Sequence, residues 1–198
     1  MTAGFSPARL TRVVSWSPGL RTITLDRAVT NFQSGQFFQL ALMRDGELTK
    51  RSYSAASAPG APLEFFLSRV PGGALTPDVF ELQEGDSVEL DENALGFFTL
   101  AEVPDAETLW LISTGTGLGP WISMLRGGQV FERFSRVVVV QGVRTRAELA
   151  YADELATCHS SHDLIHVPVV SREDAPAGGI GGRITSALVS GDLETRTR

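Results

Sequence analysis

The spacing of apolar residues changes near residue 102, and this change restricts the fold more than any other feature of the chain. Residues 9 to 100 contain short segments, roughly ten residues apart, in which apolar and polar side chains alternate. Alternation is typical of strands with one buried face, so this half predicts an antiparallel barrel or sandwich. The segments are RLTRVVSW, LRTITLD, QFFQLAL, KRSYSAAS, LEFFLSRV and DSVEL.

A single helix is expected to interrupt this first half, in the segment TPDVFELQEGD. Thr76 is a candidate N-cap because its hydroxyl could accept a hydrogen bond from a free backbone amide. Pro77 would follow at the first helical position, where its missing N–H costs nothing. Gly85 is expected to end the helix.

Beyond residue 102 the apolar runs are continuous and helical segments lie between them. Strands that are apolar throughout and separated by helices predict a parallel sheet covered on both faces. Thr145 and Glu148 have the spacing of a capping box, which predicts the start of the second intervening helix. The predicted strands are TLWLIS (108–113), VVVVQ (137–141) and LIHVPVV (164–170).

The two patterns predict two domains, residues 1–101 and 102–198, with the boundary in the polar stretch AEVPDAE. Only three parallel strands can be counted in the second domain, whereas nucleotide-binding sheets of this kind have about five or six. We therefore expect this α/β domain to be incomplete at its C-terminal side.

A glycine-rich turn follows the first parallel strand, in STGTGLGPWISMLR. Gly115, Gly117 and Gly119 permit a tight turn and a close approach of a ligand to the backbone, and Pro120 is expected at the first helical residue. The free N–H groups at the start of that helix predict an anion site. Pro120 stands where the pattern GxGxxG has its last glycine, so we expect a nucleotide fold distinct from the common dinucleotide form.

Two motifs give the chain a resemblance to a known family. RSYSAAS (51–57) matches the pattern RxYSxxS, and GTGLGP (115–120) matches GTGxxP. Together with VVVVQGVRTRAELAY they make the sequence similar to the ferredoxin/flavodoxin-NADP reductases, and most similar to their bacterial branch. The resemblance implies an antiparallel FAD-binding β-barrel followed by a Rossmann-like NADP(H)-binding domain, with hydride transfer at their junction.

The resemblance assigns the polar motif to the flavin. Arg51 would meet the FAD pyrophosphate, and Tyr53 and Ser54 would be the catalytic pair, with Tyr53 against the flavin and Ser54 near its N5. A guanidinium forms forked bonds to phosphate, an aromatic ring covers a flat heterocycle, and a hydroxyl can donate or accept. The other implied cofactor contacts are Ser52, Leu67, Ser68, Arg69, the amides of Ala74, Leu75 and Thr76, and Gly115, Thr116 and Gly117.

Simpler interpretations of these residues stay open. RSYSAAS could be a polar strand that faces solvent, with Tyr53 as a packing residue. Gly72 and Gly73, which precede the three amides, could form a plain hairpin turn.

Arginines at predicted strand ends are the candidates for the second nucleotide. The resemblance implies that Arg144, Ser171, Arg172 and Arg183 hold the 2′-phosphate that distinguishes NADP from NAD. Two charge-assisted bonds of about 1.5–3 kcal/mol each would favour NADPH by at least about a hundredfold. Glu173 leaves the alternative open, because NAD enzymes usually have an acidic residue there that holds the ribose. Each arginine taken alone could also be an ordinary surface residue.

Composition excludes several other classes of protein. Cys158 is the sole cysteine, which excludes an internal disulfide and an iron–sulfur cluster held by four thiolates. The net charge of −6 argues against a general binder of nucleic acid or membrane surfaces. No apolar run approaches the ~20 residues of a membrane span, and the opening MTAGFSPARL does not resemble a signal peptide, so we expect a cytoplasmic protein.

The cluster of Cys158, His159 and His162 resembles a metal site. It lies in polar, loop-like sequence, and structural zinc needs four ligands, so no metal is expected here.

The resemblance implies an oxidoreductase in which NADPH passes hydride to FAD and single electrons go to or from a separate ferredoxin or flavodoxin. We expect a monomer. The chain lacks the further CGxP strand and the terminal aromatic residue of the family, so a C-terminal truncation is expected. Two alternatives stay open: a flavin-binding relay or regulatory module with little reductase activity, and an NADH-dependent reductase component of an oxygenase.

Overall fold

The computed structural model describes residues 4–44 and 46–197 and divides into two compact units. The first comprises the chain up to Val103 together with Gly119–Gly127. The second comprises Pro104–Leu118 and the chain from Gly128 onward. Helix α2 (Leu118–Gly127) therefore makes most of its contacts with the first unit, although it lies between strands of the second unit in the sequence. The domain limits expected at residues 101 and 102 stay a prediction.

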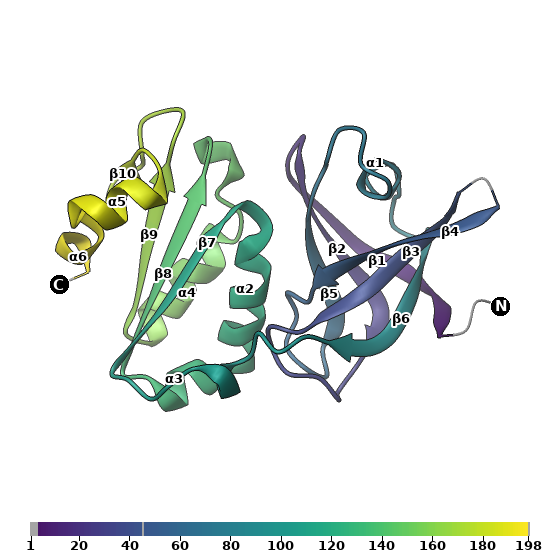
Figure 1. Ribbon diagram of the computed structural model, residues 1–198, viewed down its shortest axis with the longest axis horizontal. Helices are drawn as coiled ribbons and strands as arrows, with labels where there is room; N and C mark the ends of the chain where they lie inside the picture. The colour runs from purple at the N-terminus through teal and green to yellow at the C-terminus, as the bar shows by residue number, and fades with distance from the viewer. Residues whose placement is uncertain (1–3, 45, 198) are drawn as a thin grey trace. The chain divides into compact units, whose positions relative to one another are not determined.

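The first unit is a six-stranded antiparallel sheet in the order β4-β3-β6-β1-β2-β5 (Figure 1). An isolated bridge between Ala55 and Phe65 joins the two outer strands, and the amide of Ala56 donates to the carbonyl of Glu64 at 2.7 Å. The sheet thus closes on itself, which confirms the antiparallel barrel. The strands are β1 (Phe5–Ser17), β2 (Leu20–Ala28), β3 (Phe37–Arg44), β4 (Glu47–Ser54), β5 (Pro62–Ser68) and β6 (Ser87–Leu95).

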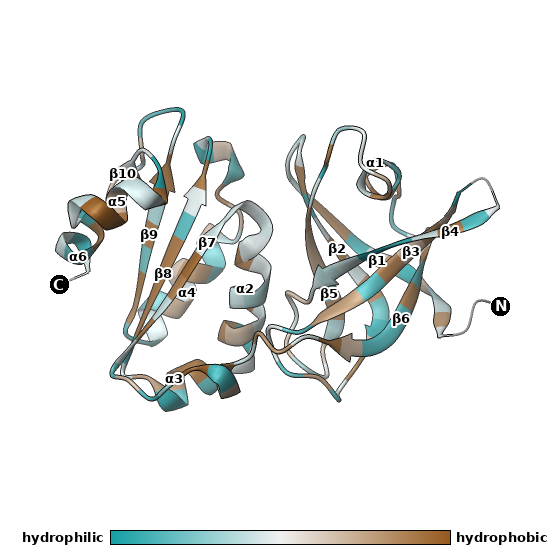
Figure 2. Cartoon of the chain, in the orientation of Figure 1, coloured by the Kyte–Doolittle hydropathy of each residue, from teal (hydrophilic) through white to brown (hydrophobic). Residues whose placement is uncertain are grey.

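Alternating apolar residues of these strands fill the barrel (Figure 2). Phe38 packs edge-on against Phe32 and Phe65, with ring centroids 5.2 and 6.2 Å apart. Leu63, Phe65 and Leu67 of β5 are all buried in this core, as the period of two requires.

Helix α1 (Thr76–Val79), which lies between barrel strands in the sequence, is shorter than the sequence predicts and begins differently. Leu75 is the N-cap residue and its side chain makes no capping bond, so the prediction of Thr76 as N-cap is wrong. The Thr76 hydroxyl instead accepts a hydrogen bond from the amide of Val70 at 3.0 Å. Phe80 caps the other end, so Gly85 does not end the helix. Gly85 lies in the turn before β6 with φ +97°.

The second unit is a parallel sheet in the order β10-β9-β8-β7. The strands β7 (Thr108–Thr114), β8 (Arg136–Val143) and β9 (Leu164–Val170) confirm the three predicted runs. A fourth, β10 (Ile180–Gly181), has only two residues, which is too short for a periodic signal. The helices of this unit are α3 (Gln129–Arg133), α4 (Ala152–Ser161), α5 (Ile184–Ser190) and α6 (Asp192–Arg196).

Strand β8 shows why these runs are apolar throughout. Val138 and Val140 pack in a cluster with residues of β9, α5 and α6, while Val137 and Val139 point to the opposite face and are equally buried. Both faces of the strand are covered, as expected for a parallel sheet.

The capping box of Thr145 and Glu148 is present, but it starts a 3₁₀ turn at Arg146–Glu148. Helix α4 begins later, after Tyr151, whose φ is 61°. The N-cap of α4 is therefore Tyr151 and not Thr145, six positions later than predicted. Among the described residues, none of the helices combines the length and the apolar composition needed to cross a membrane.

Candidate functional site

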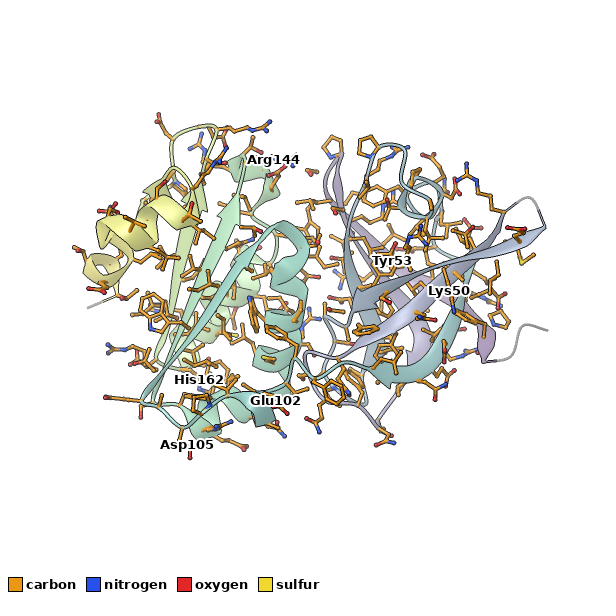
Figure 3. All side chains as sticks on the ribbon, in the orientation of Figure 1. Lys50, Tyr53, Glu102, Asp105, Arg144 and His162 are labelled. Carbon is orange, nitrogen blue, oxygen red and sulfur yellow. The ribbon has the colours of Figure 1, made fainter. Side chains whose placement is uncertain are left out.

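The motif RSYSAAS forms the second half of β4 and the segment beyond it. Arg51 pairs with Leu40 and Tyr53 with Phe38 in the antiparallel register of β3 and β4. Arg51 and Ser52 are exposed, whereas Tyr53 and Ser54 are half-buried and the Tyr53 ring packs against the barrel core (Figure 3). The strand thus combines an exposed cation with an aromatic ring that is anchored on one side.

The electrostatics of Tyr53 reflect this setting. Burial raises the pKa of its phenol, and the positive charge of Arg51 acts in the opposite direction. The guanidinium of Arg51 donates to the carbonyl of Lys50 at 2.7 Å. None of the described carboxylates forms an ion pair with it, so its charge is available to an anion.

The end of β5 gives a mixed result for the expected flavin contacts. Leu67 is buried in the barrel core with 1% of its surface exposed, so its side chain is not presented to a ligand outside the barrel. Ser68 is half-buried and pairs with Leu20 of β2. Arg69 donates to Glu81 at 2.7 Å, in a pair that is largely exposed and therefore contributes little to stability.

The loop after β5 presents three consecutive amides. Ala74, Leu75 and Thr76 donate no backbone hydrogen bond to any described residue outside helix α1. The amide of Gly73 donates to the carbonyl of Val70 at 2.9 Å and closes a tight turn. A Cβ atom added to Gly73 would lie 2.9 Å from the same carbonyl oxygen, so a larger residue does not fit here. This turn connects a strand to α1 and joins no paired strands, so it is not a hairpin. Adjacent unpaired amides suit the oxygens of a diphosphate, so these residues fit FAD.

The glycine turn of the second unit follows β7 directly. Gly115–Gly117 form a 3₁₀ turn, and among its glycines only Gly115 has a positive φ, of 53°. Thr116 is half-buried and Gly117 is exposed. Helix α2 begins at Leu118, so Pro120 is its third residue and not its first. The amides of the first turn have no partner within a helix, so a proline there still removes no bond.

Arginines gather at the carboxyl edge of the parallel sheet. Arg144 follows β8, Ser171 and Arg172 follow β9, and Arg183 lies two residues beyond β10. Parallel strands end at the same edge, and Figure 3 shows Arg144 beyond the end of β8. Arg144, Arg172 and Arg183 are exposed, and in the described ranges none of them forms an ion pair. A backbone bond from Arg172 to Arg144 holds two of these residues side by side, and the three arginine charges are uncompensated among the described residues.

Sequence reasoning missed a buried polar chain in this sheet. The Nε2 atom of His166 lies 3.0 Å from the Oε1 atom of Gln141, and the Gln141 amide donates to the carbonyl of Ala150 at 3.2 Å. Burial lowers the pKa of His166 to about 4, so the ring is neutral at pH 7. This chain ties the centre of the sheet to the loop before α4. Gln141 and His166 each stand as a polar residue in an apolar run, and this pattern did not indicate that the two side chains meet.

Helix α2 also makes side-chain hydrogen bonds to the segment after β4 that the sequence did not indicate. The buried Ser123 hydroxyl donates to the carbonyl of Ser57 at 2.6 Å. Arg126 donates to the carbonyl of Ala56 at 3.0 Å and to Glu64 at 2.8 Å. Both side chains thus hold the segment that completes RSYSAAS. Their partners are distant in sequence, so only the fold reveals them.

The cluster of Cys158, His159 and His162 does not converge on one point. The Nδ1 atom of His159 lies 2.5 Å from the carbonyl of Leu164, and the His162 ring stacks on Phe131 with centroids 3.9 Å apart. In the part of the chain that the structure describes, no group of three or more metal-ligating side chains is found. Figure 3 shows His162 at the end of the sheet opposite Arg144.

Comparisons with known proteins agree with this architecture. A family model for the oxidoreductase NAD-binding domain matches residues 111–197. The flavodoxin/ferredoxin–NADP reductase of Escherichia coli (strain K12) is 40% identical over 196 residues, which cover 98% of this chain and 79% of the relative. Ferredoxin–NADP reductase A of Sorangium cellulosum is 35% identical, over 98% of this chain and 72% of the relative.

A solved structure extends the likeness to three dimensions. It is a crystal structure of a ferredoxin NADP+ reductase from Neisseria gonorrhoeae with bound FAD and NADP. The TM-score is 0.91 at 31% identity, and the match covers 98% of this chain and 79% of the other. The chain belongs to the flavodoxin/ferredoxin–NADP reductase family.

Proposed function

We propose that the chain is an FAD-dependent ferredoxin (flavodoxin)–NADP reductase, which transfers hydride from NADPH to FAD and single electrons to or from ferredoxin or flavodoxin. The observation that carries the proposal is that each unit presents cations or free backbone donors that suit a phosphorylated nucleotide. In the first unit the site consists of Arg51 and three unpaired amides, and in the second of uncompensated arginines at the sheet edge. Relatives with this name, and a solved structure with FAD and NADP bound, support it.

In the first unit, Arg51 and the amides of Ala74, Leu75 and Thr76 hold the pyrophosphate of FAD. Tyr53 covers the flavin ring, and its anchored, half-buried position lowers the entropy cost of ordering it. The Ser54 hydroxyl can donate or accept a hydrogen bond at flavin N5. FAD, when bound, supplies the conversion between a hydride and single electrons.

In the second unit, Arg144, Ser171, Arg172 and Arg183 bind the 2′-phosphate of NADPH. The glycine turn Gly115–Gly117 lets the nucleotide approach the backbone closely, and Thr116 contacts the flavin or the nicotinamide. Tyr53 and Ser54 are then the catalytic residues, because they contact the reacting ring.

We assign ferredoxin or flavodoxin as the electron acceptor, as the names of the relatives indicate, and the single cysteine of these 198 residues cannot supply a four-thiolate cluster. Ferredoxins and flavodoxins are typically acidic, so their association with exposed arginines weakens as salt increases. A monomeric state and a cytoplasmic location stay predictions of the sequence.

Anaerobic reduction of the purified protein tests the proposal. After reconstitution with FAD, the visible spectrum is recorded and NADPH or NADH is added in separate samples. We expect a yellow protein that NADPH bleaches quickly and NADH slowly. A protein that stays colourless after reconstitution contradicts the flavin site. A yellow protein inert to both nucleotides indicates the relay module, and preference for NADH indicates an oxygenase reductase.

A further inference from the structure

We propose that Glu173 and Arg146 form a brace that positions the 2′-phosphate arginines, so that Glu173 acts as a positioning residue for NADPH and not as a ligand of the NAD ribose. This inference rests on the proposed function. Glu173 directly follows Arg172 in the sequence. A carboxylate at this place would repel a phosphate unless a nearby cation compensated its charge.

The loops that carry Arg144 and Arg172 are joined along their backbones. The amide of Ser171 donates to the carbonyl of Val143 at 3.1 Å, and the amide of Arg172 donates to the carbonyl of Arg144 at 2.9 Å. The Ser171 hydroxyl adds a third bond, to the carbonyl of Val143 at 3.2 Å. The pairing of β8 with β9 therefore continues beyond both strands.

Beyond these backbone bonds, the side chain of Glu173 makes a further link between the two loops. Its Oε1 atom accepts a hydrogen bond from the backbone N–H of Arg146 and lies 3.6 Å from the Nε atom of the same residue. One carboxylate oxygen thus binds both the backbone and the side chain of Arg146. The link runs from the loop after β9 to the loop after β8.

A second carboxylate, that of Glu148, holds the backbone of Arg144 and Thr145. The Oε2 atom of Glu148 accepts the amide of Arg144 at 2.8 Å and that of Thr145 at 3.4 Å. The backbone of Arg144 is therefore held at its amide by Glu148 and at its carbonyl by Arg172. Its guanidinium stays exposed.

Charges that are compensated by an ion pair and charges that are not lie next to each other at this edge of the sheet. The charge of Glu173 is compensated by Arg146, whereas Arg144 and Arg172 form no ion pair with any described residue. The Glu173–Arg146 pair is substantially exposed, with side-chain accessibilities of 38% and 60%, so it contributes little to global stability. Its effect is to order two loops, and correct placement of charged donors determines how well they bind phosphate.

Substitution of Glu173 tests the brace because the two interpretations predict effects of opposite sign. Loss of a nearby negative charge alone should tighten the binding of a phosphate. If Glu173 positions the arginines, Glu173→Ala should instead weaken binding of adenosine 2′,5′-bisphosphate by about tenfold, the effect of losing one good contact to a charged group. Adenosine 5′-monophosphate, which lacks the 2′-phosphate, should bind within about twofold of the original protein.

Both affinities are measured by isothermal titration calorimetry on the full chain reconstituted with FAD. Asp174→Ala is the matched control, since it removes the same charge from an adjacent exposed residue without an ion pair among the described residues. Arg146→Ala removes the side-chain contact but keeps the backbone N–H that donates to Glu173, so it should lose only part of the affinity lost in Glu173→Ala. The double variant should lose no more than Glu173→Ala alone. Glu173→Gln keeps an acceptor for the Arg146 amide and should recover part of the affinity. In steady state, KM for NADPH should rise while kcat is retained.

The inference is overturned if Glu173→Ala binds the bisphosphate as tightly as Asp174→Ala does, or more tightly. It is also overturned if Glu173→Ala weakens adenosine 5′-monophosphate as much as the bisphosphate, which identifies a ribose ligand. Arg172→Ala separates this failure from that of the proposed function. If Arg172→Ala leaves bisphosphate binding unchanged, the 2′-phosphate site itself is misplaced.

Discussion

At the scale of single residues, Arg51 and Tyr53 carry the flavin site. They are two positions apart on β4 and therefore lie on the same face of the strand. Tyr53 is anchored against the barrel core, and the charge of Arg51 reaches its hydroxyl strongly enough to offset part of the effect of burial on the Tyr53 pKa. A phosphate and a flat ring can therefore be bound by neighbouring side chains.

Replacing Arg51 tests its assigned contact with the pyrophosphate. Arg51→Ala should weaken FAD binding by about 10- to 100-fold, because it removes a charge-assisted bond of about 1.5–3 kcal/mol. Arg51→Lys should recover part of the affinity, since it keeps the charge without the forked donors. Dissociation constants come from quenching of FAD fluorescence. Arg12→Ala, at another exposed arginine of a barrel strand, is the control, and equal affinities of the Arg51 and Arg12 variants would remove Arg51 from the site.

His166 should make the stability of the chain dependent on pH. Its pKa in the folded state is about 4, below the ~6.5 of an unfolded chain, so the unfolded state binds more protons between these values. Folding stability is then fully present above pH 6.5 and decreases as the pH falls toward 4. We expect a loss of about 2 kcal/mol between pH 7 and pH 5.

Urea unfolding of the original protein and of His166→Gln at both pH values measures this effect. The variant keeps an amide donor for Gln141 and should show a smaller dependence on pH. An identical pH dependence in the original protein and in His166→Gln would exclude His166 as its source.

At the scale of elements, α2 is distinctive because it continues directly from the glycine turn and contacts the barrel. Gly119 lies against β5, where an added Cβ would be 3.7 Å from the Cβ of Phe66. Ser123 and Arg126 hold the carbonyls of Ser57 and Ala56. Residues of one helix thus stabilise the segment that follows the flavin motif.

Arg126→Ala should destabilise the first unit by about 1–3 kcal/mol, because it removes bonds to a backbone carbonyl and to the largely buried Glu64. It should also weaken FAD binding, since Ala56 directly follows the last bridge of RSYSAAS. Thermal unfolding and FAD titration measure the two effects. Arg133→Ala breaks an ion pair with the exposed Asp105 and is the control. A normal affinity for FAD in a destabilised Arg126 variant would show that the contact is structural only.

The elements also show how far sequence reasoning reaches. The six barrel strands and β7, β8 and β9 could be predicted, because all of them except the polar β4 have a clear pattern of apolar residues, and turn residues bound the segments. Strand β10 has two residues and α1 has four, so neither offers a period to read. Thr76 and Thr145 are residues of a type that often caps α-helices. The Thr76 hydroxyl instead accepts the amide of Val70, and Thr145 caps a 3₁₀ turn. Such choices depend on neighbours that are distant in sequence.

The site divides in the same way. The arginines at the sheet edge could be predicted, because strand ends are visible in the sequence and parallel strands end together. The brace of Glu173 and Arg146 could not, since it joins two loops 27 positions apart. The resemblance assigns Leu67 to the flavin, but the alternation of Leu63, Phe65 and Leu67 along β5 already indicates a side chain in the core.

At the scale of the whole molecule, the distribution of charge matters more than its sum. The chain carries a net charge of −6, yet its proposed substrate and cofactor are anions. Attraction therefore depends on local cations whose charge no carboxylate compensates, and Arg144, Arg172 and Arg183 meet this condition at one edge of one sheet. Sixteen of the seventeen cationic side chains are arginine, and a role in recognition is assigned only to Arg51 and to the three at this edge.

The most direct test of the account is the ratio of kcat/KM for NADPH to that for NADH, with ferricyanide as acceptor, in the FAD-loaded protein and in the variant Arg144→Ala/Arg172→Ala. We predict a ratio of about a hundred or more in the original protein, and a ratio near one in the variant through a higher KM for NADPH. A ratio near one in the original protein, or a ratio that survives both substitutions, would contradict the account.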